Sequence, residues 1–296
     1  MRALVIINGY PNGEKFYRQG ERIAVALQEL GVETDVLKNG EVYAKIDNDG
    51  KISSSFGEKY AFAVFLDKDK YLGRMLESCG IRLFNRAEAV EICDDKLLTF
   101  LALAQGGVRL IKSMPAPLCY TPSAKPSEYF LSEVAKNFSF PLIAKKSYGS
   151  FGAGVRLVSG MDELRKTEEE WLRIPHFYQE YVSTACGRDI RVIVVGGKSL
   201  GGMERRAQEG EFRSNIELGG IGAKIELPKA ERKLAEKVAT LLGLDYCGVD
   251  VLQTEDGPVL CEVNSNAFFE GFESALGIDV AKEYALHILK TVKESK

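Results

Sequence analysis

Residues 249–264 read Val-Asp-Val-Leu-Gln-Thr-Glu-Asp-Gly-Pro-Val-Leu-Cys-Glu-Val-Asn, and this stretch decides the expected fold. Two apolar runs flank a Glu-Asp-Gly turn signal, a pattern that predicts a β-hairpin. With Glu-Asp-Gly as the loop, Thr254 pairs with Pro258, and Asp250 then lies directly opposite Glu262. The two carboxylates are therefore expected to be neighbours across the strands.

The predicted hairpin has one face with polar groups. Cross-strand partners share a face of a sheet, and so do residues two apart, which places Asp250, Glu262 and Asn264 on one side. That face is also expected to carry Leu252 and Leu260 nearer the turn, and the opposite face Val251, Cys261 and Val263.

Two carboxylates and an amide on an apolar hairpin are unfavourable unless something neutralises them. Carboxylate and amide oxygens suit Mg²⁺ or Mn²⁺, so Asp250, Glu262 and Asn264 are predicted metal ligands. The alternative is that both acids are solvated on an exposed face. The interpretation depends on the turn, because a loop one residue longer or shorter would put Asp250 and Glu262 on opposite faces.

The whole chain has an ordinary globular composition. Its 296 residues are 45% hydrophobic and 27% charged, enough for two or three sub-domains. A net charge of −3 offers no general attraction for nucleic acid or an anionic membrane, and no run approaches the ~18 apolar residues of a membrane span. The apolar N-terminus is too short for a signal peptide, and six cysteines lack a CxxC spacing, so a reduced cytoplasmic protein is expected. Only two histidines are present, so histidine-based triads and zinc sites are not expected.

The first 93 residues are expected to form a small α/β domain. The pattern is β-α-β-β-α-β and lacks G-x-G-x-x-G, so the expected role is scaffold plus one wall of a substrate cleft. The expected strands are 3–7, 32–37, 60–66 and 81–84, and the expected helices lie around 23–30 and at 70–78.

The next segment, 87–105, is expected to be one helix, with Asp94-Asp95-Lys96 on a solvated face. Prolines in 113–126 indicate an extended crossing between sub-domains. Further expected helices are 162–171, 229–242 and 279–293; further expected strands are 176–182, 188–195 and 199–203; and 265–272 is expected to be an aromatic loop.

A glycine-rich loop connects two predicted strands at residues 140–158. Glycines at 149, 152 and 154 let backbone N–H groups approach phosphate oxygens, and a lysine on the incoming strand has the same reach. Because the loop joins two strands, it matches neither a Walker A loop nor a Rossmann loop. An ordinary flexible turn remains the alternative.

Five arginines at strand ends suit planar recognition of carboxylate or phosphoryl oxygens. The alternative, surface ion pairing, is expected for at least two of them. They are interleaved with acids and so do not form the basic patch of a nucleic-acid-binding protein. The five are Arg188, Arg191, Arg205, Arg206 and Arg213.

In combination, these segments resemble the ATP-grasp superfamily and, within it, the RimK-type glutamate ligases. The resemblance runs from about residue 94 to the C-terminus. It rests on six pieces in order: Lys145 before Gly149-x-x-Gly152-x-Gly154, Gln179-Glu180-Tyr181, Asp189-Ile190-Arg191, Glu204-Arg205-Arg206 with Phe212-Arg213-Ser214-Asn215, Gly248-Val249-Asp250, and Glu262-Val263-Asn264. The resemblance implies an α/β (α+β) ATP-grasp fold: an N-terminal parallel domain (1–93), a central sub-domain (94–175) and a C-terminal sub-domain (176–296), with nucleotide between the last two.

The resemblance also implies roles for the matching residues. The ATP phosphates would be held by Lys96 and Lys145 and covered by a mobile loop with Gly149, Ser150, Gly152 and Gly154. Adenine would bind at a hinge of Glu180, Tyr181 and Val182, and the ribose would contact Asp189. Contacts to the nucleotide and the acyl phosphate would come from Arg213, Ser214 and Asn215. Two Mg²⁺ ions, with Mn²⁺ as an alternative, would bind Asp250, Glu262 and Asn264. Catalytic contacts would come from Arg191, Arg205 and Arg206.

The implied reaction is ATP-dependent carboxylate–amine ligation through an acyl phosphate, with glutamate as the expected amino acid. The carboxylate acceptor, whether protein, peptide or small molecule, stays open, because Ser265-Asn266-Ala267-Phe268-Phe269 departs from the family's small-Pro-Gly turn. A homo-oligomer is expected from the family, without nucleic-acid or membrane partners. The alternatives are an ATP-grasp phosphotransferase and a non-catalytic nucleotide-binding regulatory module.

Overall fold

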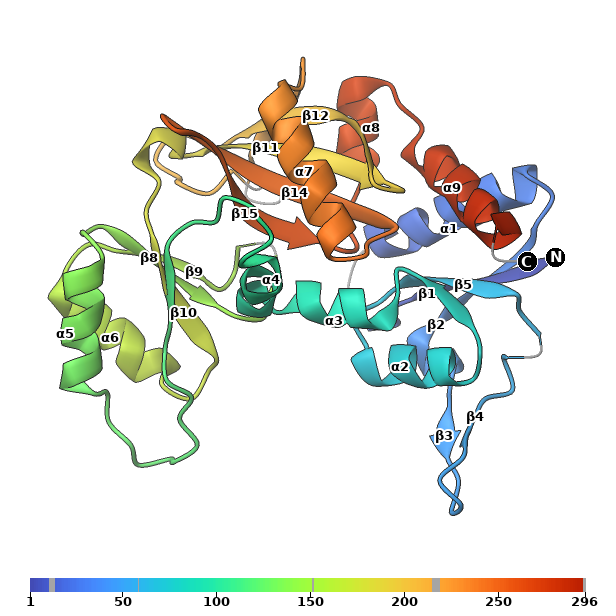
Figure 1. Ribbon diagram of the computed structural model, residues 1–296, viewed down its shortest axis with the longest axis horizontal. Helices are drawn as coiled ribbons and strands as arrows, with labels where there is room; N and C mark the ends of the chain where they lie inside the picture. Colours follow the sequence, from blue (N-terminus) through green and yellow to red (C-terminus); the bar gives the residue numbers. More distant parts are fainter. Residues whose placement is uncertain (11–13, 58, 151, 215–218, 295–296) are drawn as a thin grey trace.

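A parallel sheet forms the N-terminal part of the computed structural model, which describes residues 1–10, 14–57, 59–150, 152–214 and 219–294 (Figure 1). Its strand order is β2-β1-β5-β6, and all neighbours are parallel. The predicted β-α-β-β-α-β order is confirmed, with a small hairpin inserted that the sequence did not indicate. The elements are β1 (Arg2–Ile7), α1 (Glu14–Glu29), β2 (Glu33–Lys38), η1 (Asn39–Glu41), β3 (Lys45–Ile46), β4 (Ile52–Ser53), β5 (Phe62–Leu66), α2 (Lys70–Ser78) and β6 (Arg82–Phe84).

The central part is an antiparallel sheet with strand order β7-β10-β8-β9. The glycine-rich loop connects β8 to β9, as the sequence predicts, and α5 and α6 cover the outer side of the sheet (Figure 1). Helix α5 was not among the expected elements. The bounds are β7 (Ser113–Pro115), α5 (Glu128–Asn137), β8 (Leu142–Lys146), β9 (Val155–Val158), α6 (Met161–Trp171) and β10 (His176–Glu180).

The C-terminal part is a second antiparallel sheet, ordered β13-β12-β11-β14-β15. One face packs on α7, and β13 and α8 are additions to the expected elements; α8 replaces the end of the loop expected at 265–272. The bounds are η2 (Ser183–Ala185), β11 (Arg188–Val195), β12 (Lys198–Arg206), β13 (Ile221–Ile225), α7 (Lys229–Leu241), β14 (Tyr246–Thr254), β15 (Gly257–Asn264), α8 (Glu270–Leu276) and α9 (Val280–Glu294).

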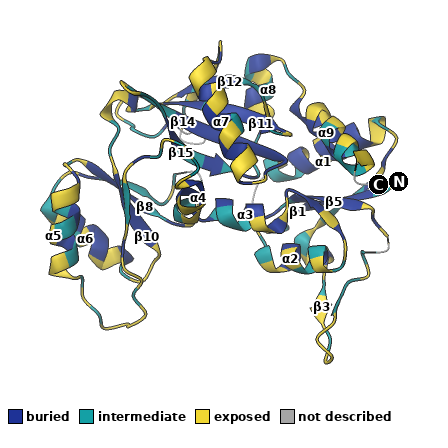
Figure 2. Ribbon diagram, in the orientation of Figure 1, coloured by how far each residue is buried: buried dark blue, intermediate teal, exposed yellow. Residues whose placement is uncertain are grey.

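The first and last helices share a hydrophobic core. Ile23 and Leu27 of α1 belong to the same buried cluster as Tyr284 and Ile288 of α9. Figure 2 shows strands buried in all three parts and exposed outer helix faces. Within the described parts of the chain, no helix is long and apolar enough to cross a membrane.

The expected single helix at 87–105 is wrong, because it breaks at Asp95 into α3 (Ala87–Asp94) and α4 (Lys96–Leu103). Asp95 has an extended backbone, and its carboxylate accepts hydrogen bonds from the N–H groups of Leu97 and Leu98. The solvated face expected for this triplet is also wrong, since Asp95 is 9% exposed and the Lys96 side chain 13%. Capping ends one helix and starts the next.

Replacing Asp95 with Ala is expected to lower the free energy of unfolding by about 1–2 kcal/mol, the effect of losing a buried N-cap. Urea denaturation measures the change. The more exposed N-cap Ser127, which accepts one hydrogen bond from Phe130 N–H, provides the comparison, and Ser127→Ala should have the smaller effect. Equal stability of Asp95→Ala and the native protein would contradict the capping role.

The hairpin of β14 and β15 has a shorter turn than expected. Thr254 pairs with Gly257, which leaves a loop of Glu255 and Asp256, so the predicted pairing of Thr254 with Pro258 is wrong. The register shifts between Asp250 and Val251, because Cys261 is an extra residue that forms a β-bulge. Beyond the bulge Asp250 pairs with Glu262, as predicted.

Candidate functional site

Two adjoining cavities lie where the three sheets meet. The larger has a volume of about 440 Å³ and the smaller about 120 Å³. The residues that line both are Lys96, Gly149, Ser150, Arg205 and Glu262. These shared residues form the boundary at which groups bound in the two cavities would meet.

The smaller cavity lies between the central and C-terminal sheets. It brings together the predicted lysine Lys145, the glycine loop and the segment 180–182, with apolar surface from Ile143 and Leu252. The other predicted residues that line it are Asp189, Arg213, Ser214 and Asp250. Asn215 lies outside the described residues. A slot with apolar walls and cationic groups at one end suits a flat heterocycle that carries phosphates.

The bulge at Cys261 changes which side chains face this cavity. Cys261 and Glu262 are consecutive, yet both line it, while Leu260 is fully buried in the core with Val251. The expected faces of Leu260 and Cys261 are therefore wrong, because a bulge shifts the alternation by one residue. Burial raises the pKa of the Cys261 thiol to about 11.

Buried charges form a network on the floor of the site. Arg191 Nε and Nη2 each donate to Asp250 over 2.7 Å. Arg205 Nη2 lies 2.5 Å from Asp189 Oδ2 and 2.9 Å from Asp250 Oδ2, and Ser214 Oγ donates to Asp189. Burial raises the pKa of Asp250, but the two arginines outweigh it and hold the pKa below its usual value. Burial lowers the pKa of Arg205, and Asp250 and Asp189 raise it above its usual value.

Asp250 is thus neutralised by guanidinium groups rather than left unpaired on the hairpin. Glu262 is different: its side chain is 29% exposed, and its ion pair with Lys96 spans 3.5 Å. Asn264 lines the larger cavity beside it. In the described chain no cluster of three His, Cys, Asp or Glu residues has the geometry of a metal centre, so Asn264 would have to complete an oxygen donor set. Carboxylate and amide oxygens are the right chemistry for Mg²⁺, and this donor set fits it.

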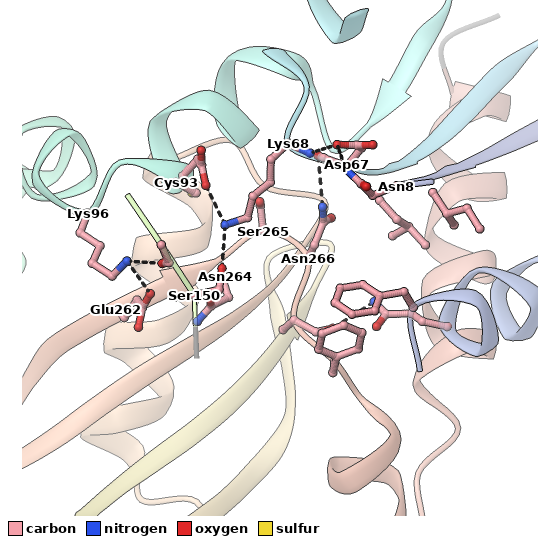
Figure 3. Close-up of a pocket in the computed structure, with 18 of the residues that line it drawn as sticks. Asn8, Asp67, Lys68, Cys93, Lys96, Ser150, Glu262, Asn264, Ser265 and Asn266 are labelled. Atoms are coloured by element: carbon pink, nitrogen blue, oxygen red, sulfur yellow. Dashed lines mark hydrogen bonds and ion pairs between the residues drawn. The ribbon is translucent and has the colours of Figure 1, made fainter. Parts of the chain in front are cut away.

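The glycine-rich loop is held by cations from three directions. Lys96 Nζ donates to the Gly149 carbonyl over 2.6 Å, and Arg213 Nη1 to the Gly152 carbonyl over 2.9 Å. Lys68 Nζ, from the N-terminal part, lies 3.3 Å from Ser150 Oγ (Figure 3). Gly149 and Gly152 have φ values of 124° and 72°, which favour glycine.

Arg206 does not join the site. It follows Arg205 on β12 and therefore points to the other face of the sheet. Its side chain is 66% exposed and pairs with Glu204. The prediction that at least two of the five arginines form surface ion pairs fits Arg206 and Arg188, which both pair with Glu204. Arg213 pairs with Glu211 but lines the smaller cavity.

The N-terminal part supplies one wall of the larger cavity, as expected, but its residues were not identified from the sequence. Asn8 and Asp67 directly follow the parallel strands β1 and β5, and Lys68 comes next. Ligands bind at the carboxyl ends of strands in such sheets, which is the signal that would have found them. This wall continues through Phe16 and Gln19 of α1 to Asn266 and Phe268, since Asn266 bonds the Asp67 carbonyl and Gln19 bonds the Ala267 carbonyl.

The arrangement of sheets and cavities defines an ATP-grasp fold. D-alanine–D-alanine ligase from Bacillus anthracis, solved with ATP, superposes with a TM-score of 0.74 at 22% identity, covering 100% of both chains. A RimK domain ATP-grasp protein from Sphaerobacter thermophilus gives a TM-score of 0.71 at 18% identity, covering 97% of this chain and 99% of that one. At these identities the likeness shows the fold.

The chain belongs to the RimK-like ATP-grasp family, whose model matches residues 93–288. A probable alpha-L-glutamate ligase of Marinomonas sp. is 32% identical over 287 residues, 91% of each chain. Beta-citrylglutamate synthase B of Danio rerio is 34% identical, and the match covers 88% of this chain and 67% of the relative. The Homo sapiens protein of the same name is 35% identical, and the match covers 75% of this chain but only 58% of the relative. The predicted fold, family and class of enzyme, an ATP-dependent ligase, are confirmed, and this family uses ATP and divalent metal ions.

Proposed function

We propose that this protein activates an acceptor carboxylate with ATP and joins it to the amine of an amino acid. The observation that carries the proposal is the shared boundary of the two cavities, where Lys96, Arg205 and Glu262 meet the glycine-rich loop. A nucleotide in the smaller cavity would present its γ-phosphate there to a carboxylate in the larger one. The relatives' names support glutamate as the amino acid.

The smaller cavity is the proposed ATP site. Lys96 and Lys145 would neutralise phosphate oxygens, and the loop at 149–154 would close over them and exclude water. The residues proposed to hold adenine and ribose are Glu180, Tyr181, Val182 and Asp189, and Arg213 and Ser214 are proposed phosphate contacts. The same role for Asn215 stays a prediction from the sequence, because that residue lies outside the described part of the chain.

Glu262 and Asn264, with Asp250 behind them, are proposed to hold Mg²⁺. When bound, the ions would neutralise charge on the transferring phosphoryl group. Arg191 and Arg205 each bond Asp250, so their proposed role is to fix that carboxylate and add positive potential beside the phosphoryl group. The exposed Arg206 is left out of this machinery.

The proposed chemistry has two displacements. An oxygen of the acceptor carboxylate attacks the γ-phosphorus, and the bond between the γ-phosphorus and the oxygen bridging to the β-phosphate breaks. The products are ADP and an acyl phosphate. The free-base amine of the amino acid then attacks the acyl carbon and the carbon–oxygen bond to phosphate breaks. The nitrogen loses one proton to the departing phosphate, and an amide and inorganic phosphate form. Lys96 and Arg205 line both cavities, which supports a role for them in neutralising the negative charge that develops in both steps.

We also propose the functional division 1–93, 94–175 and 176–296. The first strand of the last part, β10, crosses back to complete the central sheet, and all three parts contribute residues to the cavities. The proposed use of ATP and the six cysteines without disulfides support a cytoplasmic location for the protein. A homo-oligomer without nucleic-acid or membrane partners is part of the same proposal.

Phosphate release from ATP should require both an amino acid and a carboxylate acceptor. The test measures phosphate and ADP while each amino acid is combined with panels of peptides and small carboxylic acids, followed by mass spectrometry of the product. An amide product supports ligation. A stable phosphorylated product without an amine would instead identify a phosphotransferase, and nucleotide binding without turnover a regulatory module.

A further inference from the structure

One wall of the larger cavity carries buried oxygens without hydrogen-bond partners. Among the described residues, four buried polar side-chain atoms are unpaired, and three belong to residues of this cavity: Gln19 Oε1, Asp67 Oδ2 and Asn266 Oδ1. Buried polar atoms in native proteins are nearly always paired, so three on one wall call for a ligand.

The two amides are oriented by their own donors. Gln19 Nε2 donates to the Ala267 carbonyl over 3.1 Å, and Asn266 Nδ2 donates to the Asp67 carbonyl over 3.2 Å. Because each NH₂ group bonds a backbone carbonyl, the amide oxygens are the atoms left free, and these only accept. The wall therefore offers three acceptors.

Asp67 adds a charge to this wall. Its side chain is 4% exposed, and Oδ1 accepts from Asn8 Nδ2 and from the N–H groups of Lys68 and Asp69. Among the described residues, none forms an ion pair with Asp67. The neighbouring ammonium group, Lys68 Nζ, lies 2.7 Å from Asp94 Oδ1 instead. Burial raises the pKa of Asp67. A buried carboxylate without a counter-charge is unfavourable, and a cationic ligand would relieve it.

This wall is separate from the proposed reacting end. Figure 3 shows Lys96 and Glu262 on one side of the cavity, with Asn8, Asp67 and Asn266 grouped on the other. A group bound at Asp67 would therefore be held away from the phosphoryl group and would not react.

We propose that Asp67, Gln19 and Asn266 bind a non-reacting primary ammonium group of the carboxylate acceptor. A primary ammonium has three N–H donors and one positive charge, which match three acceptors and one carboxylate. The acceptor is then an amino acid or a peptide with a free amine, not an N-acylated or purely anionic acid. This inference rests on the proposed function for the acceptor's role.

The test compares matched probes. Amino acids and glycyl dipeptides, each beside its N-acetyl derivative, are offered as acceptors in the ADP-release assay and, with Mg²⁺ and ADP, in a thermal-shift assay. Free amines should raise the melting temperature more than their N-acetyl partners and give about 10- to 100-fold higher kcat/KM, the range for a charge-assisted hydrogen bond. Asp67→Asn should remove this preference by lowering kcat/KM for the free amines only.

Stability of the ligand-free protein gives a second readout. Asp67→Asn should raise the melting temperature, because it removes an unpaired buried charge. Asp35→Asn is the matched control: Asp35 is paired with Arg2 and Tyr60 outside the cavity, and its substitution should lower the melting temperature.

The outcomes distinguish failure of the ammonium site from failure of the proposed function. Equal use of N-acetyl and free acceptors, no thermal shift with any free amine, or destabilisation by Asp67→Asn overturns the ammonium site. If turnover never depends on an amino acid, the proposed function fails, but amine-dependent thermal shifts would still support the site.

Discussion

Replacing Glu262 with Gln is expected to abolish most amino-acid-dependent ATP turnover while the fold stays intact. Glu262 lines both cavities, and its carboxylate is not paired with an arginine as that of Asp250 is. Gln keeps the shape but not the charge that holds a divalent cation, so kcat should fall by about 100- to 1,000-fold, the range for losing one electrostatic contact to the transition state.

The fold should tolerate this change because the Glu262 side chain is 29% exposed and its Lys96 partner lies 3.5 Å away. The free energy of unfolding should change by less than about 0.5–1 kcal/mol. Glu255→Gln, at the tip of the same hairpin, should leave turnover unchanged. Full activity of Glu262→Gln would remove this residue from the site.

Replacing Arg205 with Met is expected to destabilise the protein by about 3–5 kcal/mol, the range for removing one partner of a buried ion pair. Arg205 is 3% exposed and bonds both Asp189 and Asp250, so the substitution leaves carboxylates short of positive charge. Arg206→Met, one residue along β12, removes an exposed pair and should cost less than about 1 kcal/mol. Urea denaturation of both variants measures the contrast.

The pH dependence of this difference provides a further check on Arg205. The pKa of Asp250 is lowered in the folded protein, so the unfolded chain binds more protons as the pH falls through its usual carboxyl range near pH 4. The stability from Asp250 is therefore present above that pH and lost below it. In Arg205→Met the deficit should be largest at neutral pH and shrink in acid. A deficit that does not vary with pH would point to lost packing instead.

The sequence predicted the order of the sheets and named most of the candidate residues that line the smaller cavity, because those signals are local. Lys145, the glycine loop and Asp189 lie at the ends of strands whose apolar runs are readable without tertiary information. The break at Asp95 was missed because helical periodicity continues through it, and only the capping geometry separates α3 from α4.

The pairing of Asp250 with Glu262 was right for an incomplete reason. The turn is one residue shorter than expected, which alone would have put the two carboxylates on opposite faces, and the extra residue Cys261 restores the register. No residue pattern in the strand indicates a bulge there. Asn8 and Asp67 could have been named from their positions after β1 and β5, but their place beside Asn266 depends on how the first sheet docks against the third.

The core shared by α1 and α9 has a consequence for synthesis on the ribosome. Ile23 and Leu27 leave the ribosome long before Tyr284 and Ile288, which belong to the same buried cluster. Until α9 emerges, the nascent chain therefore displays an uncovered apolar face on α1, a natural target for chaperones. Completion of the N-terminal part must wait until α9 has left the ribosome.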